Sequence, residues 1–215
     1  MSDTGNIAGS GRGGTVPLFA VPFSAVNTGA DREFNARLAS HCEAQCPPGR
    51  TQVRGHDDFL DSPDAGEIRR RILGHAAGVV AGLCGIGADE FGQLRLQARG
   101  WCSVVRRNGH VPAQHFPGAA WLAVYCAQAG EPDADARGAG VLRLHERRLG
   151  SIYRDASTRE LAPPYRYGNH TWTPLPGWMA LFPAYLPHEI SVVRSDAPLI
   201  LVFALLRFAD PGQEE

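Results

Sequence analysis

The chain has 215 residues, of which 44% are hydrophobic, and its 21 basic and 22 acidic side chains leave a formal net charge of −1. This length suits one β-rich domain, and the lack of a basic stripe interleaved with aromatic residues argues against a nucleic-acid partner. No apolar run approaches the ~18 residues that cross a bilayer, so we expect no membrane partner.

The first 15 residues, MSDTGNIAGSGRGGT, are rich in Gly and Ser and lack an apolar stretch. They predict a disordered tail (1–15) without a secretory signal, ahead of a single domain over residues 16–210, and we expect a cytoplasmic protein. The cysteines are sparse and odd in number, which argues against a disulfide framework and predicts free, reduced thiols. They are Cys42, Cys46, Cys84, Cys102 and Cys126.

The N-terminal part predicts one strand and two helices. Residues 16–23 (VPLFAVPF) predict a short edge strand, because two prolines exclude a central position in a sheet. Residues 31–45 predict a helix, since apolar side chains recur there every four residues. A second helix is expected to begin at Ser62, with Ser62 as N-cap and Pro63 in the first turn, and to end at Gly85.

From residue 91 onward the pattern changes to strands. Short apolar segments, several of them alternating, are separated by Gly and Pro turns and cover residues 94–106, 119–127, 140–144, 171–173, 178–182, 189–194 and 199–208. Strands that follow helices in this way predict a mainly β fold with flanking helices (α+β), in which a sandwich or barrel has the N-terminal helices packed outside it.

The loop 146–168 is long for a compact domain and contains Tyr153, Arg154 and Tyr165. Long loops inside compact domains are often functional lids. The aromatic and arginine side chains favour a lid over a substrate site.

Three histidines are candidate metal ligands. His110 and His115 bracket a turn in NGHVPAQHFPG, and His188 begins the strand that follows FPAYLP. Imidazole is the commonest metal-binding side chain, and strands hold it rigidly. Early and late strands of a jelly roll would bring the three to one mouth, as in a non-haem iron site with open positions. The alternative for His188 is a strand-end histidine that bonds a backbone carbonyl.

Residues 16–208 resemble a bacterial and phage family of 2-oxoglutarate/Fe(II)-dependent oxygenases. The similar segments are PLFAVPF, GWCSVVRRNG, HFPGAAWLAVYC, GVLRLHERRLG and PLPGWMALFPAYLPHEI. The resemblance implies a double-stranded β-helix (jelly-roll, cupin-like) barrel that binds Fe(II) and 2-oxoglutarate and oxidises a C–H bond of a small molecule or peptide. The family's Phe-Pro-x4-His element matches Phe182, Pro183 and His188, which implies His188 as an iron ligand.

The first-ligand motif departs from the family. Its His-x-His-Pro turn corresponds here to Gln114-His115-Phe116-Pro117. A one-residue deletion would leave His115 as the first ligand, whereas an ungapped match would place Gln114 and Phe116 at the two ligand positions. We prefer the deletion, because it keeps a histidine at the strand mouth. The usual triad carboxylate has no counterpart at its position, so the third ligand stays open between His110, water and a halide. Further candidates are His145, Glu146 and His170.

A second departure concerns 2-oxoglutarate. Family members carry an arginine about ten residues after the last histidine, where it binds the distal carboxylate through two parallel hydrogen bonds. Pro and Leu occupy those positions here. Arg207, Arg194 and Arg148 are the candidate replacements, or they are surface charges. Tyr125 either donates to the cofactor carboxylate from inside the barrel or packs in the core.

Three functions remain open at this point. The first is the Fe(II)/2-oxoglutarate oxygenase with a small-molecule or peptide substrate. The second is an all-histidine, cupin-type metalloenzyme that does not use 2-oxoglutarate, motivated by the two departures. The third is a catalytically degenerate barrel that binds a ligand. A homodimer is compatible with each of them.

Overall fold

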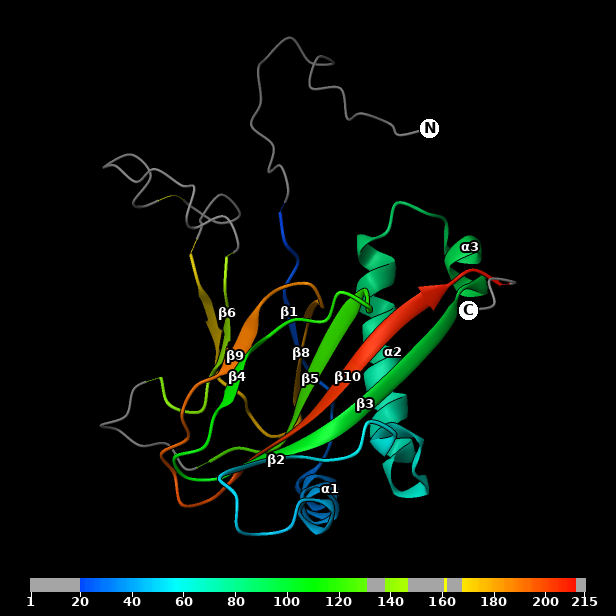
Figure 1. Cartoon of the computed structure of the whole chain (residues 1–215). Coiled ribbons are helices and arrows are strands. Elements are labelled where there is room, and N and C mark those ends of the chain that lie inside the picture. The colour runs from blue at the N-terminus through cyan, green and yellow to red at the C-terminus, as the bar shows by residue number, and fades with distance from the viewer. Residues whose placement is uncertain (1–19, 131–137, 147–160, 162–167, 212–215) are drawn as a thin grey trace.

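The computed structural model describes residues 20–130, 138–146, 161 and 168–211. Its strands are β1 (Ser24–Asn27), β2 (Gln52–Arg54), β3 (Arg95–Val105), β4 (Val111–Gln114), β5 (Trp121–Gln128), β6 (Leu142–Leu144), β7 (His170–Trp172), β8 (Trp178–Pro183), β9 (His188–Ile190) and β10 (Leu199–Ala209). They form a larger sheet in the order β1-β8-β5-β10-β3-β2 and a smaller one in the order β4-β9-β6-β7. The two sheets lie on opposite sides of a shared apolar core (Figure 1).

The strands of the larger sheet are apolar on both faces. Along β10, Leu201 and Phe203 belong to the core shared with the smaller sheet. Val202 and Ala204 belong to a second core, under the helices. A strand buried on both faces needs an uninterrupted apolar sequence, which accounts for the run at residues 199–206.

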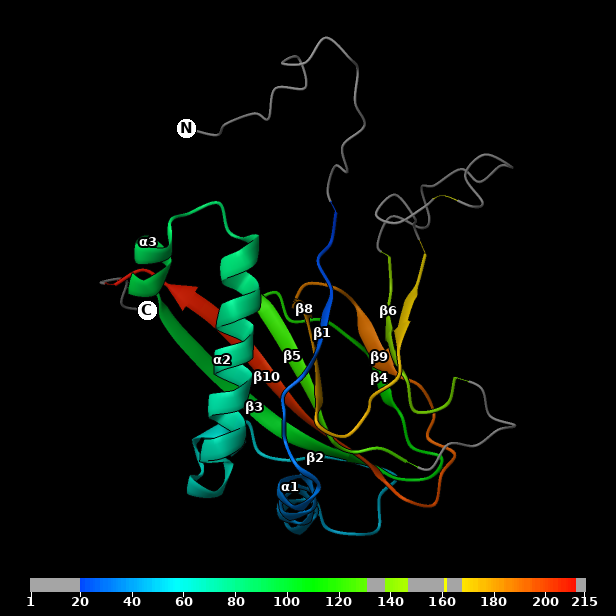
Figure 2. The same ribbon diagram turned by 180° about the vertical axis from the view of Figure 1, so that it is seen from behind.

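The helices cover the face of the larger sheet that points away from the smaller one (Figures 1 and 2). They are α1 (Arg32–Gln45), α2 (Gly66–Leu83) and the short α3 (Ala88–Gln93), with 3-10 turns η2 (Phe59–Asp61) and η3 (Pro63–Ala65) before α2. The expected packing of helices outside the sheets is thus confirmed.

Helix starts were predicted unevenly. The first helix was expected to begin at Asp31, and Asp31 is the N-cap of α1, since its carboxylate accepts a hydrogen bond from the Phe34 amide at 2.7 Å. Ser62 does not cap α2, so that prediction is wrong. Its hydroxyl donates instead to the Phe59 carbonyl at 2.8 Å, Pro63 begins the turn η3, and α2 starts only at Gly66. A hydroxyl bonded back to the preceding turn is not available to the helix amides.

The N-terminal edge strand lies further along the chain than expected. β1 spans Ser24–Asn27 at the edge of the larger sheet, paired with β8, so the edge position is confirmed. The two prolines precede it, since Pro22 lies outside the strand and Pro17 falls outside the described residues. None of the helices in the described part combines the length and apolar composition that a membrane span requires.

Gly100 marks a close approach between β3, β10 and the turn η2. A Cβ atom there would meet the Phe203 carbonyl oxygen and lie 2.7 Å from Leu60 Cδ1. We expect Gly100→Ala to lower the free energy of unfolding by about 1–3 kcal/mol, because backbone and core cannot both move aside. Urea denaturation measures this change. Gly74→Ala on α2 is the control, since nothing lies within 4 Å of its Cβ position. Equal stability of the Gly100→Ala chain and the wild type would contradict this packing.

Candidate active site around His188

His188 is the buried polar group at the centre of the candidate site. It begins β9, where its Cα pairs with Gln114 of β4 on one side and Leu144 of β6 on the other. Its side chain is only 1% exposed and points into the core between the two sheets. The rings of Phe182 and Phe116 lie 5.4 Å and 5.8 Å from its ring, measured between centroids. The sheet therefore holds this imidazole rigidly against aromatic walls.

The hydrogen bonding of His188 defines its tautomer. Nδ1 lies 2.9 Å from the Leu186 carbonyl oxygen. A carbonyl only accepts, so Nδ1 carries the hydrogen and Nε2 of the neutral ring presents a lone pair. Nε2 is buried and has no hydrogen-bond partner among the described residues. A metal-binding histidine has this arrangement, with its other nitrogen donating to a backbone carbonyl. Both sequence-based interpretations of His188 are thus compatible with it.

Burial also keeps His188 neutral. Desolvation lowers the pKa of its imidazole to about 4; the Leu186 carbonyl opposes this shift, and the nearby His115 and His145 reinforce it. A neutral ring at physiological pH is the form that binds a metal ion.

The lowered pKa of His188 predicts that the folded protein becomes less stable at acid pH. The folded pKa lies below the unfolded value of about 6.5, so the stability is fully present above pH ~6.5 and is lost as the pH falls toward 4. Between pH 7 and pH 4, we expect the wild type to lose roughly 3 kcal/mol more unfolding free energy than His188→Leu, which cannot titrate there. Urea melts at both pH values measure the difference. Parallel losses in the two proteins would show that His188 is not held neutral.

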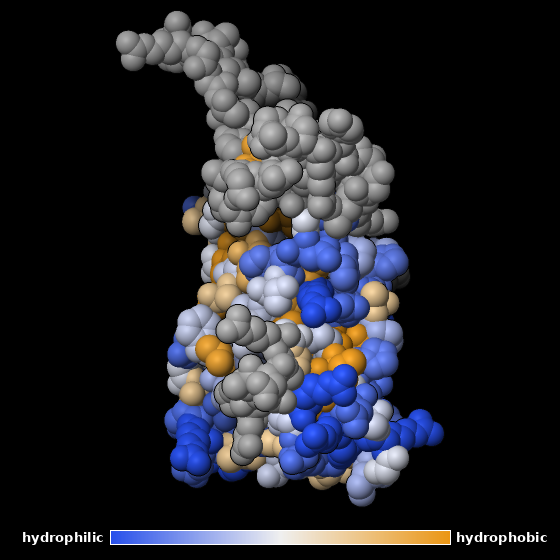
Figure 3. All heavy atoms as spheres, turned by 90° about the vertical axis from the view of Figure 1, so that its left-hand side faces the viewer, coloured by the Kyte–Doolittle hydropathy of each residue, from blue (hydrophilic) through white to orange (hydrophobic). Residues whose placement is uncertain are grey.

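Two further histidines lie on either side of His188. His115 follows β4 directly and is exposed, and it is close enough to His188 to influence its pKa. His145 follows β6, and its Nε2 lies 3.8 Å from a carboxylate oxygen of Glu189. Glu189 also accepts from Arg143, and this polar group lies on the outer face of the smaller sheet. Figure 3, which views the molecule from that side, shows hydrophilic side chains interspersed with hydrophobic ones.

The residues beside His188 are Gln114 and Phe116, which are the two residues that the ungapped family match places at the ligand positions. Gln114 is its register partner, and Phe116 packs its ring against the imidazole. His115 lies between these two residues in sequence and is exposed. The placement thus favours the ungapped match over the deletion that the sequence led us to prefer. Among the described residues, no group of three or more His, Cys, Asp or Glu side chains could hold a metal ion.

The third histidine of the predicted set lies elsewhere. His110 precedes β4 at its far end, and the first residue of that strand, Val111, pairs with Ile190 rather than with His188. At ~3.3 Å per residue, this places His110 roughly 10 Å or more from the His188 row. The structure therefore does not bring His110, His115 and His188 together. The hypothesis of an all-histidine metalloenzyme needs these three ligands, so the structure does not support it.

The predicted cofactor residues are placed differently from one another. Alternation places Arg207 on the face of β10 that Leu201, Phe203 and Leu205 share, and it is exposed near the end of the strand. Arg194 is an exposed residue of the β9–β10 loop and donates to Asn108 at 2.9 Å. Four predicted residues fall outside the described part of the chain, namely Arg148, Tyr153, Arg154 and Tyr165.

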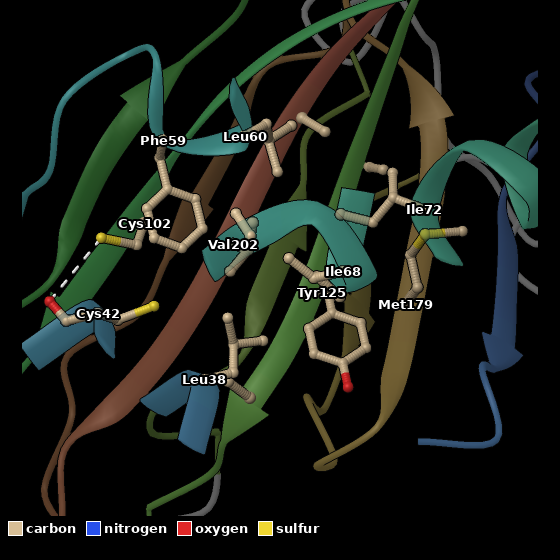
Figure 4. Packing of buried hydrophobic residues seen from close by; sticks show 14 of the residues in the cluster. Leu38, Cys42, Phe59, Leu60, Ile68, Ile72, Cys102, Tyr125, Met179 and Val202 are labelled. Carbon is tan, nitrogen blue, oxygen red and sulfur yellow. Dashed lines mark hydrogen bonds between the residues drawn. The ribbon is translucent and has the colours of Figure 1, made fainter. Parts of the chain in front are cut away.

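Tyr125 lies on the other side of the larger sheet from His188. Figure 4 shows it in the core beneath the helices, near Leu38 and Ile68. Its hydroxyl donates to the Asn35 side-chain oxygen on α1. Burial raises the pKa of Tyr125 to about 12. Tyr125 is therefore a core residue, and the expectation that it reaches a cofactor from inside the barrel is corrected.

Two arginines on the face of β3 that Trp101 shares were missed. Arg95 and Arg99 share a face with Trp101, which is buried in the core between the sheets. Alternation along residues 94–106 would have placed them together. Their position relative to Arg207 depends on the register of β3 against β10, which no local signal specifies.

Comparisons with known proteins identify solved structures that have a similar fold. No protein-family model matches the chain, and no curated protein matches it either. Among solved structures, a Pseudomonas putida prolyl-4-hydroxylase is 15% identical, with 88% of this chain and 93% of that chain covered and a TM-score of 0.57. The non-heme alpha ketoglutarate dependent epimerase SnoN from nogalamycin biosynthesis is 13% identical, with coverages of 90% and 81% and a TM-score of 0.56. HygX from Streptomyces hygroscopicus, with nickel and 2-oxoglutarate bound, is 11% identical, with coverages of 87% and 83% and a TM-score of 0.56. The chain shares the fold of these three proteins over most of its length.

Proposed function

We propose that the protein is a non-haem Fe(II)/2-oxoglutarate-dependent oxygenase that oxidises a small molecule, and that it belongs to the bacterial and phage family that its sequence resembles. The observation that carries the proposal is that the Nε2 atom of His188 is buried in this fold and has no hydrogen-bond partner within the part of the chain that the structure describes. Two similar structures support it, since HygX was solved with nickel and 2-oxoglutarate, and SnoN with Fe3+, alpha ketoglutarate and nogalamycin RO. A cytoplasmic location and a homodimer stay predictions.

Of the candidate iron ligands, His188 fits well and the second is less well placed. His188 fits a ligand by tautomer, charge state and burial. His115 directly follows Gln114, the residue that pairs with His188, and is the candidate second ligand although its side chain is exposed. The described residues offer no third ligand. We therefore propose that iron would be held by His188, with His115 as the candidate second ligand and without a protein carboxylate from the described residues.

Bound iron and 2-oxoglutarate would supply the oxidising chemistry, and the chain's own residues position and shield them. Phe116 and Phe182 pack against the His188 ring and help to bury it. The Leu186 carbonyl fixes the ring orientation through Nδ1. Arg207 projects from the barrel-facing side of β10 and is the candidate for the distal carboxylate of 2-oxoglutarate, which a guanidinium binds through two parallel bonds.

Turnover of 2-oxoglutarate tests the proposal. With Fe(II), ascorbate and oxygen, we expect the wild type to release succinate slowly even without substrate, and His188→Leu to release none above background. His110→Ala is the matched control and should keep the wild-type rate, since it lies at the far end of β4. Succinate release that is equal in all three proteins would mean that the observed turnover does not come from this site.

A second function is favoured by one observation. The two family ligand positions beside His188 are occupied by Gln114 and Phe116, and a phenyl ring cannot bind a metal ion. A barrel of this kind would bind a ligand among its aromatic side chains without catalysis. Absence of Fe(II) binding in a folded wild-type protein would favour this function over the oxygenase.

A further inference from the structure

Three cysteines gather in the core beneath the helices. Cys42 and Cys46 lie four residues apart at the end of α1, and Cys102 lies on the face of β3 that the helices cover. The Sγ atoms of Cys46 and Cys102 are 3.8 Å apart, and both cysteines are free thiols. Cys102 Sγ also lies 3.9 Å from the Cys42 carbonyl oxygen, a contact that Figure 4 marks with a dashed line. The fold thus brings together thiols from two elements that are distant in sequence.

The other two cysteines have different surroundings. Cys84 follows α2 and is exposed. Cys126 lies on β5 in the core shared by the two sheets, where burial raises the pKa of its thiol. Within the described ranges, no group of three or more His, Cys, Asp or Glu residues could hold a metal ion, so the chemistry open to the cluster is that of its thiols. Cys84 and Cys126 are an exposed and a buried reference for that chemistry.

The hydrogen bonds within the cluster distinguish the three sulfur atoms. The side-chain hydrogen bond with Cys42 lowers the pKa of Cys102, a smaller contribution from Cys46 acts in the same direction, and desolvation opposes both. Burial raises the pKa of Cys46 to about 12. The thiolate is the reactive form of cysteine, so these shifts favour Cys102 as the first sulfur to react.

A short stretch of chain covers the Cys46–Cys102 pair. Residues 47–51, between α1 and β2, are all exposed. β2 has three residues and lies at the edge of the larger sheet, and its Val53 carbonyl oxygen is 3.8 Å from Cys46 Sγ. Short edge elements open locally at a lower free energy than the whole fold. A small oxidant therefore reaches these sulfur atoms without global unfolding.

We propose that Cys46 and Cys102 form a redox modification site, which a hydroperoxide converts into an intramolecular disulfide. The Cys102 thiolate attacks a peroxide oxygen, the O–O bond breaks, and Cys102 becomes a sulfenic acid while the alkoxide or hydroxide leaves and takes up a proton. Cys46 sulfur then attacks Cys102 sulfur, and the sulfenic hydroxyl leaves as water with the Cys46 proton. The two thiols lose two electrons, which the hydroperoxide accepts. The sulfur atoms need only approach from 3.8 Å to ~2.05 Å.

The disulfide would join the end of α1 to β3 and close residues 46–102 into a covalent loop. Such a link restricts the unfolded chain, so the oxidised protein should unfold at a higher urea concentration than the reduced one. Reduction with dithiothreitol should restore the original midpoint. This modification goes beyond the proposed function, because it requires neither iron nor 2-oxoglutarate.

Peptide mapping of the folded, metal-free full chain tests the proposal. After treatment with hydrogen peroxide and alkylation of the remaining thiols, mass spectrometry without reduction should find a peptide pair linked through Cys46 and Cys102. We expect Cys46→Ala and Cys102→Ala to lose that pair. Cys42→Ala is the matched control, as a buried cysteine of the same cluster, and should keep it. Urea denaturation of each reduced variant shows whether it is folded, and the wild-type map does not depend on any variant.

Three outcomes would overturn the redox site. The first is a wild-type protein in which Cys46 and Cys102 both stay unlinked under excess peroxide. The second is a link that appears only when urea has unfolded the chain. The third is a disulfide that joins other cysteines, such as one between exposed Cys84 residues of two molecules. Because no iron is present, loss of the proposed oxygenase function would leave each of these results unchanged.

Discussion

Replacing His188 with leucine is expected to abolish Fe(II) binding without unfolding the protein. The change removes the buried lone pair of His188 Nε2 and leaves an apolar side chain beside Phe116 and Phe182. We expect metal affinity to fall by more than ~100-fold, since altering even an outer contact of a metal ligand costs about 10–100-fold. The free energy of unfolding at pH 7 should stay equal or rise by ~1 kcal/mol, because an unsatisfied buried polar atom is lost.

Anaerobic titration with Co(II) or Fe(II), together with urea denaturation, measures both quantities. His110→Ala is the matched control, as a second histidine beside β4 that lies away from the site. A loss of stability by several kcal/mol with unchanged metal affinity would identify His188 as a structural residue instead.

Introducing a histidine at position 114 is expected to have the second largest effect. Gln114 pairs directly with His188 across β4 and β9, and paired side chains on one face have Cβ atoms ~4.5–5.5 Å apart. Two imidazoles at that separation can bind one divalent ion. We therefore expect Gln114→His to tighten Co(II) or Ni(II) binding by roughly tenfold or more, as deprotonated imidazoles add affinity.

Thr171→His is the control for this gain, because Thr171 pairs with Arg143 on the outer face of the smaller sheet. Calorimetry on the three proteins gives the comparison. No change on Gln114→His, or the same gain on Thr171→His, would contradict the register that places Gln114 beside His188.

The sequence allowed most of the strands to be predicted because they are buried on one or both faces. The apolar run of β10 and the Pro-bounded corner after Phe182 were visible without any tertiary information, and so was the position of His188 at a strand start. The start of α2 was not, because Ser62 has an alternative bond partner in the preceding turn. Local capping rules do not include such competition.

The sequence did not predict which residue of β4 lies beside His188. Whether Gln114 or His115 faces the core depends on a one-residue register choice, and a slip of one residue moves every side chain to the other face. Only the pairing of β4 with β9 decides it, and that pairing joins residues 74 positions apart.

The measurement that tests the central claim most directly is an anaerobic titration of the metal-free protein with Fe(II) and then 2-oxoglutarate, followed in the visible range. Our account predicts a weak metal-to-ligand charge-transfer band in the wild type, its loss in His188→Leu, its weakening in His115→Ala and its retention in His110→Ala. A band that persists in His188→Leu, or no band in a wild-type protein that has bound iron, would contradict the account.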